Sequence, residues 1–70
     1  MQNVSARLKN RRTELGINIS HLAKTAHVPH SVVSRIESGE CTYSRHLFEI
    51  ADALNVNIDW LVRGRMPMKL

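Results

Sequence analysis

The sequence predicts an all-α fold of five short helices, and three observations support this prediction. Apolar residues recur at helical spacing in most of the chain, as at Leu47, Ile50 and Leu54. Glycines and short polar residues stand between these stretches, where helices end and begin. A chain of 70 residues can bury only about 60% of its unfolded surface, which suits one compact domain. We therefore expect a single domain over residues 1–70, with an ordered core of about 4–64 and a frayed tail of 65–70.

Capping signals place the five helices along the chain. The candidate N-caps are Ser5, Asn18, Ser44 and Asn57, whose side-chain oxygens can accept from free backbone N–H groups. The glycines Gly16, Gly39 and Gly64 fall where a helix end needs a left-handed residue. We expect helices over residues 5–15, 18–26, 29–38, 44–55 and 57–63.

The first expected helix places an arginine within an apolar stripe. Val4, Leu8, Arg12 and Leu15 lie on one side of it. A buried charge is costly unless it is paired, and Glu37 at the end of the third helix is the best candidate partner. We predict a partly buried structural ion pair between Arg12 and Glu37; the alternative is an Arg12 side chain that reaches solvent.

The second and third expected helices, joined by a short turn, form a helix-turn-helix pattern. Their apolar stripe consists of Leu22, Ala23, Ala26, Val28, Val33 and Ile36, with a break at residues 27–29. This stripe leaves His30, Ser31, Ser34 and Arg35 on the polar side of the third helix. Short polar side chains and an arginine can read base edges in a major groove, so these four are candidate base-reading residues.

The last helix carries more apolar residues than one side can bury. Trp60 is expected in the core, but Ile58, Leu61 and Val62 cannot all face inward on so short a helix. An exposed apolar patch often marks a partner site. A second copy of the chain is the simplest partner, with these three residues at a homodimer interface.

Charge and composition narrow the function class. The net charge is +4, with basic excess in residues 1–15 and 63–70 and acidic excess between them. This pattern fits phosphate contacts with nucleic acid, and a solvated basic face fits equally well. No apolar run approaches the ~20 residues of a membrane span, and the polar N-terminus is unlike a signal peptide. With a single cysteine, we expect a cytoplasmic protein.

The sequence gives little support for metal binding or catalysis. The residues His27, His30, Cys41 and His46 lack the spacing of a zinc site, which needs four converging ligands. Nothing supplies a base for the Cys41 thiol, and His30 and Ser31 are neighbours that do not face each other on a helix. We therefore expect no metal, no cofactor, no small-molecule substrate and no enzymatic activity.

Five motifs stand in a particular order along the chain. They are Arg7-Leu8-Lys9-x-Arg11-Arg12-x-x-Leu15-Gly16-Ile17-Asn18, Leu22-Ala23, Ser34-Arg35-Ile36-Glu37-x-Gly39, Arg45-x-Leu47-x-Glu49-Ile50-Ala51-x-Ala53-Leu54 and Asp59-Trp60-Leu61. With this ordered set, residues 4–64 resemble the DNA-binding domains of lambdoid-phage repressors and Cro proteins, within the Xre-type helix-turn-helix family. The resemblance implies a five-helix lambda-repressor-like fold.

The resemblance also implies a function. A Cro-like transcriptional repressor would bind a pseudo-palindromic double-stranded operator as a homodimer, with residues 29–38 in the major groove. His30, Ser31, Ser34 and Arg35 match positions that read bases, and Arg35 can contact guanine with two hydrogen bonds. The residues Lys9, Asn18 and Ser38 match positions that hold the phosphate backbone, and Arg45 matches one near the minor groove.

Three positions depart from the family pattern, and two of them, Ile19 and the loop of residues 40–44, motivate an alternative. Ile19 stands where a glutamine is usual, and His27 replaces the turn glycine. Residues 40–44 carry one acid and no base, although this loop is often basic in relatives. The alternative is a helix-turn-helix module used mainly for protein–protein interaction, with a regulator or an antitoxin partner and with weak DNA binding.

Overall fold

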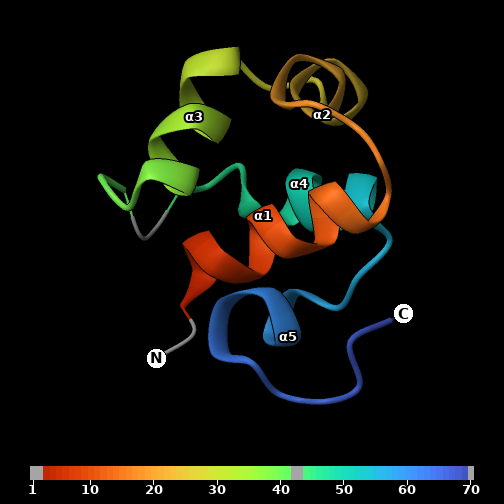
Figure 1. Cartoon of the computed structure of the whole chain (residues 1–70). Coiled ribbons are helices and arrows are strands. Elements are labelled where there is room, and N and C mark those ends of the chain that lie inside the picture. Colours follow the sequence, from red (N-terminus) through yellow and green to blue (C-terminus); the bar gives the residue numbers. More distant parts are fainter. Residues whose placement is uncertain (1–2, 42–43, 70) are drawn as a thin grey trace.

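The computed structural model describes residues 3–41 and 44–69, and this part of the chain contains five helices. They are α1 (Val4–Glu14), α2 (Ile19–Ala26), α3 (His30–Ser38), α4 (Leu47–Leu54) and α5 (Ile58–Arg63). α1 crosses the middle of the molecule, with α2 and α3 on one side and α5 on the other (Figure 1). No helix of the described part is long and apolar enough to span a bilayer. The predicted all-α fold is confirmed.

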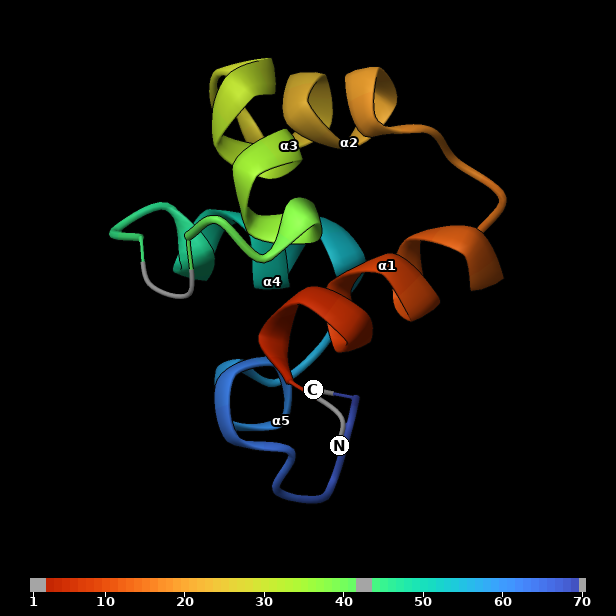
Figure 2. The same ribbon diagram turned by 60° about the vertical axis from the view of Figure 1, so that its left-hand side comes forward.

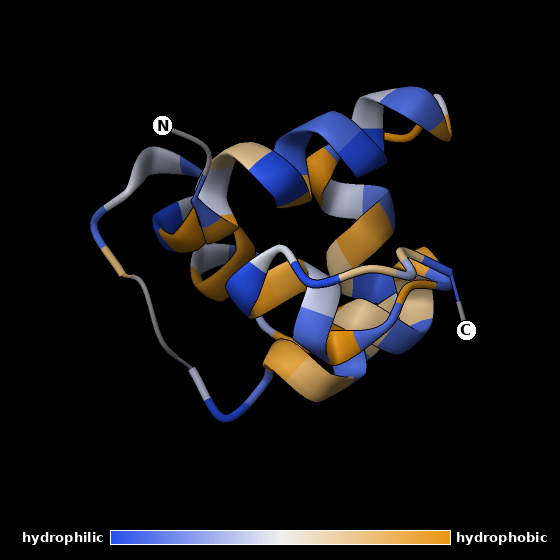
Figure 3. Ribbon diagram, turned by 90° about the horizontal axis from the view of Figure 1, so that it is seen from below, coloured by the Kyte–Doolittle hydropathy of each residue, from blue (hydrophilic) through white to orange (hydrophobic). Residues whose placement is uncertain are grey.

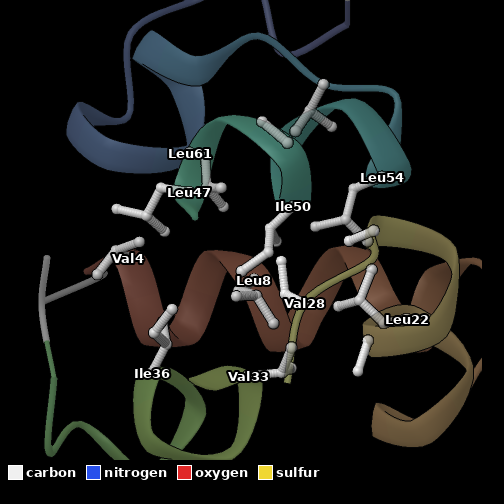
Figure 4. Close-up of a cluster of buried hydrophobic side chains, with 14 residues drawn as sticks. Val4, Leu8, Leu22, Val28, Val33, Ile36, Leu47, Ile50, Leu54 and Leu61 are labelled. Atoms are coloured by element: carbon white, nitrogen blue, oxygen red, sulfur yellow. The ribbon is translucent and has the colours of Figure 1, made fainter. Parts of the chain in front are cut away.

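The hydrophobic core draws on every helix. Leu8 of α1 lies at its centre, with side chains from the other four helices around it (Figure 4). The largest fully buried side chains are Leu8, Leu22, Val33, Ile36, Leu47, Ile50, Leu54, Val56 and Leu61. Polar and apolar residues alternate along the ribbons, as expected for helices that bury one side each (Figure 3).

Most helix ends lie where the capping signals predicted them. The Asn18 side chain accepts from the backbone N–H of His21 at 2.7 Å, and Asn57 accepts from that of Asp59 at 3.1 Å. All three glycines have positive φ, as predicted. His27 and Asn55 also adopt the left-handed conformation, with φ of 58° and 59°, and end α2 and α4. Both residue types tolerate this region better than most.

Two of the predicted N-caps are wrong. Asn3, rather than Ser5, caps α1 by accepting from the N–H of Ala6 at 3.0 Å. Ser5 lies inside α1, where its hydroxyl donates to the carbonyl of Ile36 in α3. Ser44 forms a turn instead of a cap, because its hydroxyl accepts from the N–H of His46 at 3.1 Å. Such local bonds compete with helix formation, so α4 begins at Leu47.

The buried side of α1 differs from the predicted stripe. Val4 and Leu8 are buried as expected, but the Leu15 side chain is 42% exposed because α1 ends at Glu14. Two arginines of α1, Arg7 and Arg11, are buried instead, with only 9% and 6% of their surface exposed. The amphipathic pattern therefore identified the apolar half of this face and missed its two arginines.

The C-terminal tail folds back along the α4–α5 connection. The backbone N–H of Asn57 donates to the carbonyl of Met68 at 2.7 Å, and Val56 pairs with Lys69 in an isolated antiparallel bridge. Met68 also packs against the core. The expectation of a frayed end is therefore wrong for residues 65–69, and Leu70 lies outside the described residues.

The two leucines of the predicted α1 stripe should differ in their effect on stability. Leu8→Ala leaves a cavity in the core and should lower the free energy of unfolding by about 3 kcal/mol. Leu15→Ala, the matched control at an exposed position, should lower it by less than about 1 kcal/mol. Urea denaturation followed by circular dichroism measures both. Equal losses would contradict the assigned burial.

Candidate nucleic-acid interface

The turn between α2 and α3 sets the angle of the helix-turn-helix. His27 ends α2 in the left-handed conformation, and the N–H of Val28 donates to the carbonyl of Ala23 at 3.0 Å. Val28 is buried and anchors the turn in the core. Pro29 then precedes α3 as its N-cap residue, with φ of −61° and an extended ψ of 142°. The turn predicted at residues 27–29 is present without a glycine.

The outer side of α3 carries the four predicted base-reading residues. Val33 and Ile36 are fully buried and hold the inner side of α3. His30, Ser31 and Arg35 are exposed, while Ser34 is half-buried. Ser31, Ser34 and Arg35 are three and four residues apart, so they share one side of the helix. Ser31, Ser34 and Arg35 therefore form a polar ridge along α3, in which Ser34 is less exposed than the other two.

The four residues predicted to contact phosphates differ in whether their hydrogen-bond donors are still free. Lys9 and Arg45 are exposed cations. Asn18 accepts with Oδ1, so its side-chain NH₂ remains available as a donor at the N-terminus of α2. The Ser38 hydroxyl already donates to the carbonyl of Arg35 at 2.9 Å. A hydroxyl has one hydrogen, so Ser38 must break this bond before it can donate to a phosphate.

Ile19 lies where a phosphate-binding glutamine is usual in the family. It is half-buried at the start of α2 and packs against the core. The Ile19 side chain thus stabilises the packing of α2 against the core, and it has no group that could form a hydrogen bond with a phosphate. Asn18 beside it still offers a polar side chain at this helix entry.

The predicted ion pair between Arg12 and Glu37 is present. Arg12 Nε donates to Glu37 Oε2 at 2.6 Å and Nη2 donates to Oε1 at 3.0 Å. Arg12 Nη1 also donates to the carbonyl of Ile17 at 2.8 Å. The two side chains are 13% and 8% exposed. The hydrogen bond to Glu37 raises the pKa of Arg12, so its guanidinium stays charged at any ordinary pH.

Two other arginines of α1 have roles that the sequence did not indicate. Arg7 Nε and Nη2 donate to the carbonyls of Leu61 and Val62, both at 2.8 Å. Arg11 Nε donates to the carbonyl of Leu54 at 3.0 Å. These bonds fill acceptors at the ends of α5 and α4. Since Arg12 is paired with Glu37, three of the four cations in residues 1–15 are bonded within the protein and unavailable to phosphates, which corrects the interpretation of the charge pattern.

An apolar hollow lies between α4 and α5. It has a volume of about 220 Å³ and is lined by Ser44, Leu47, Phe48, Ile58, Asp59, Val62 and Arg63. Phe48 is 62% exposed at its edge. Leu61 is fully buried in the core, so it cannot contact a partner and its assignment to a dimer interface is wrong. Phe48, which the sequence pattern did not single out for this surface, lines the hollow together with Ile58 and Val62.

Within the described residues, no three histidine, cysteine or acidic side chains converge in a way that could hold a metal ion. His30 is on the outer side of α3, and His46 precedes α4. The histidines considered as ligands thus lie on different elements.

Comparisons with known proteins agree with this architecture. The helix-turn-helix family model matches residues 8–61. The chain is 36% identical over 64 residues to transcriptional regulators of the conjugative elements R391 from Providencia rettgeri and SXT from Vibrio cholerae. The match covers 91% of this chain but only 30% of each regulator.

A solved structure shares the whole fold. The P22 c2 repressor, crystallised in complex with a synthetic operator, superposes with a TM-score of 0.85 at 27% sequence identity. The match covers 93% of this chain and 100% of that chain. The family model spans the turn, the buried face of α3 and most of the core described above. The chain therefore belongs to the helix-turn-helix family.

Proposed function

We propose that the chain is a sequence-specific DNA-binding repressor of transcription that places α3 in the major groove. The observation that carries this proposal is the two-sided character of α3. Its inner side is fully buried at Val33 and Ile36, while His30, Ser31 and Arg35 face outward. A helix held in this way can enter the DNA major groove, which is about 12 Å wide, while its inner side stays packed in the core.

The proposed base contacts depend mainly on Arg35. Its guanidinium is exposed and makes no ion pair among the described residues. Arginine donates two parallel hydrogen bonds to guanine, which discriminates against other bases by about 1–3 kcal/mol. Ser31 and His30 can each donate or accept, and Ser34 contributes from a half-buried position.

The proposed backbone contacts flank α3. Lys9 and Arg45 supply positive charge, and the free amide hydrogens of Asn18 supply neutral donors at the entry of α2. Anions are favoured at a helix N-terminus, where backbone N–H groups point outward. Ser38 contributes as a donor only if its bond to the Arg35 carbonyl opens.

We propose that the chain binds DNA as a Cro-like homodimer through the hollow between α4 and α5. Phe48, Ile58 and Val62 supply its apolar surface. Asp59 and Arg63 lie on the rim four residues apart. A two-fold axis can therefore place Asp59 of each copy beside Arg63 of the other, so that opposite charges meet. A pseudo-palindromic operator would then present half-sites about 34 Å apart.

The names of similar proteins support a role in gene regulation. The regulators of conjugative elements and the operator-bound P22 c2 repressor are all named as regulators or repressors. By analogy, occupancy of a promoter by this chain would exclude RNA polymerase. Such a role is exercised in the cytoplasm, on the DNA of a bacterial host or its phage.

Selection from a random pool of DNA duplexes, followed by sequencing, tests the proposed function. We expect enrichment of a two-fold symmetric sequence and an affinity that falls steeply with salt, by about one logarithmic unit per phosphate contact for each tenfold rise in salt. A pool without enrichment and with a flat salt dependence would contradict the proposal. That result would favour the alternative of a module that binds mainly proteins.

Single substitutions should separate base reading from backbone contact. Arg35→Ala should cost about 1–3 kcal/mol on the selected duplex and relax specificity at one base position of each half-site. Lys9→Ala should weaken selected and random DNA alike and reduce the salt slope by about 1. Fluorescence anisotropy on both duplexes measures these effects. An equal loss on both duplexes for Arg35→Ala would refute its role in base reading.

Phe48, at the edge of the hollow, should contribute strongly to the affinity of the dimer. Phe48→Glu places a charge on the proposed dimer surface and should weaken dimerisation at least about tenfold, because it removes an apolar contact and leaves an unpaired charge in its place. Glu49→Gln at the next residue of α4, which is exposed but outside the hollow, is the control. Sedimentation equilibrium measures both variants. Unchanged association of Phe48→Glu would place the interface elsewhere.

A further inference from the structure

The end of α5 is held by an arginine from another helix. Arg7 of α1 donates to the carbonyls of Leu61 and Val62, two of the last acceptors of α5. A helix leaves its last four carbonyls without partners inside the helix, and a cation is favoured beside them. The Arg7 side chain satisfies two of them at once while it is only 9% exposed.

The chain closes tightly over this guanidinium. Gly64 follows α5 with φ of +74°, and a Cβ built on it would lie 3.1 Å from Arg7 Nη1. Its N–H donates to the carbonyl of Trp60 at 2.8 Å, so the turn after α5 wraps around the arginine. α5 has only six residues and few hydrogen bonds of its own. Besides the burial of Leu61, its position therefore depends on the two bonds from Arg7.

Arg7 also lies between two surfaces of the molecule. α1 packs against α3 on one side and against α5 on the other, and both views show α3 and α5 on opposite sides of α1 (Figure 1, Figure 2). Ser5 and Arg12 bind α3 from the same helix from which Arg7 binds α5. A single helix thus connects the polar ridge of α3 to the apolar residues of α5.

We infer that Arg7 is a positioning residue that sets the distance between the two α3 helices of a dimer, and hence the spacing of half-sites that the dimer accepts. This inference rests on the proposed dimeric binding of DNA. α5 carries Ile58 and Val62 of the proposed dimer surface. A shift of α5 relative to α1 moves the partner, and with it the second α3, while the α3 of the same chain keeps its own contacts.

Arg11 provides a matched control within the same helix. It lies one turn beyond Arg7, is equally buried, and caps α4 at the carbonyl of Leu54. That end of α4 is six residues from Phe48, and Leu54 does not line the hollow. Loss of the Arg11 bond should therefore lower stability without moving the dimer surface.

The test compares Arg7→Met with Arg11→Met on DNA, at a temperature where both variants are folded. The probes are the duplex enriched from the random pool, the same duplex with one base pair inserted between the half-sites, and a single half-site. Wild type should prefer the native spacing over the inserted one. Arg7→Met should reduce that preference by about tenfold and leave half-site affinity within about twofold. Arg11→Met should leave the preference unchanged.

Hydrogen exchange without DNA separates this inference from the proposed function. Arg7→Met should speed exchange of the α5 amides while those of α2 and α3 stay protected. If α5 exchange or spacing preference changes equally in both variants, or in neither, the inference is overturned. If wild type shows no spacing preference, the proposed dimeric function fails, whatever α5 does. Arg7→Lys, which keeps the charge but not the forked geometry, should give intermediate values and serves if Arg7→Met does not fold.

Discussion

The Arg12–Glu37 ion pair is the interaction on which the candidate interface depends. Two hydrogen bonds of 2.6 and 3.0 Å join the last turn of α1 to the end of α3, and a third reaches the α1–α2 loop at Ile17. The pair therefore fixes α3 at the end away from the turn, while Val28 anchors the turn itself. A polar ridge can read DNA only if its helix is held at both ends, because base contacts require fixed distances and angles.

Much of the fold could be predicted from local chemistry. The asparagine caps of α2 and α5 and the left-handed residues after the helices lie where short-range rules place them. The Arg12–Glu37 pair was also predictable, since an arginine in an apolar stripe demands a partner and few acids lie near the core. The four candidate base-reading residues follow from the same periodicity, because α3 buries one side and exposes the other.

What the sequence did not reveal depends on contacts between distant segments. Arg7 and Arg11 resemble surface cations in a helical pattern, and only the folded chain brings the carbonyls of α5 and α4 to them. The same limit applies to Leu61, because the packing of α5 against α1 and α4 decides which of its apolar residues is buried. Phe48 beside the hollow is the converse case, an apolar residue that packing leaves exposed. Positive charge on α1 thus serves mainly to join helices, and the cations that face solvent for DNA are fewer than the composition suggests.

A double-mutant cycle on Arg12 and Glu37 tests the central claim most directly. Arg12→Met and Glu37→Leu should each lower the free energy of unfolding by about 3 kcal/mol, because each leaves one largely buried charge without its partner. The double variant removes both charges and should lose much less than the sum, with a coupling energy of about 2–3 kcal/mol. Losses that add within about 0.5 kcal/mol would show that α1 and α3 are held together by other contacts, and would contradict this account.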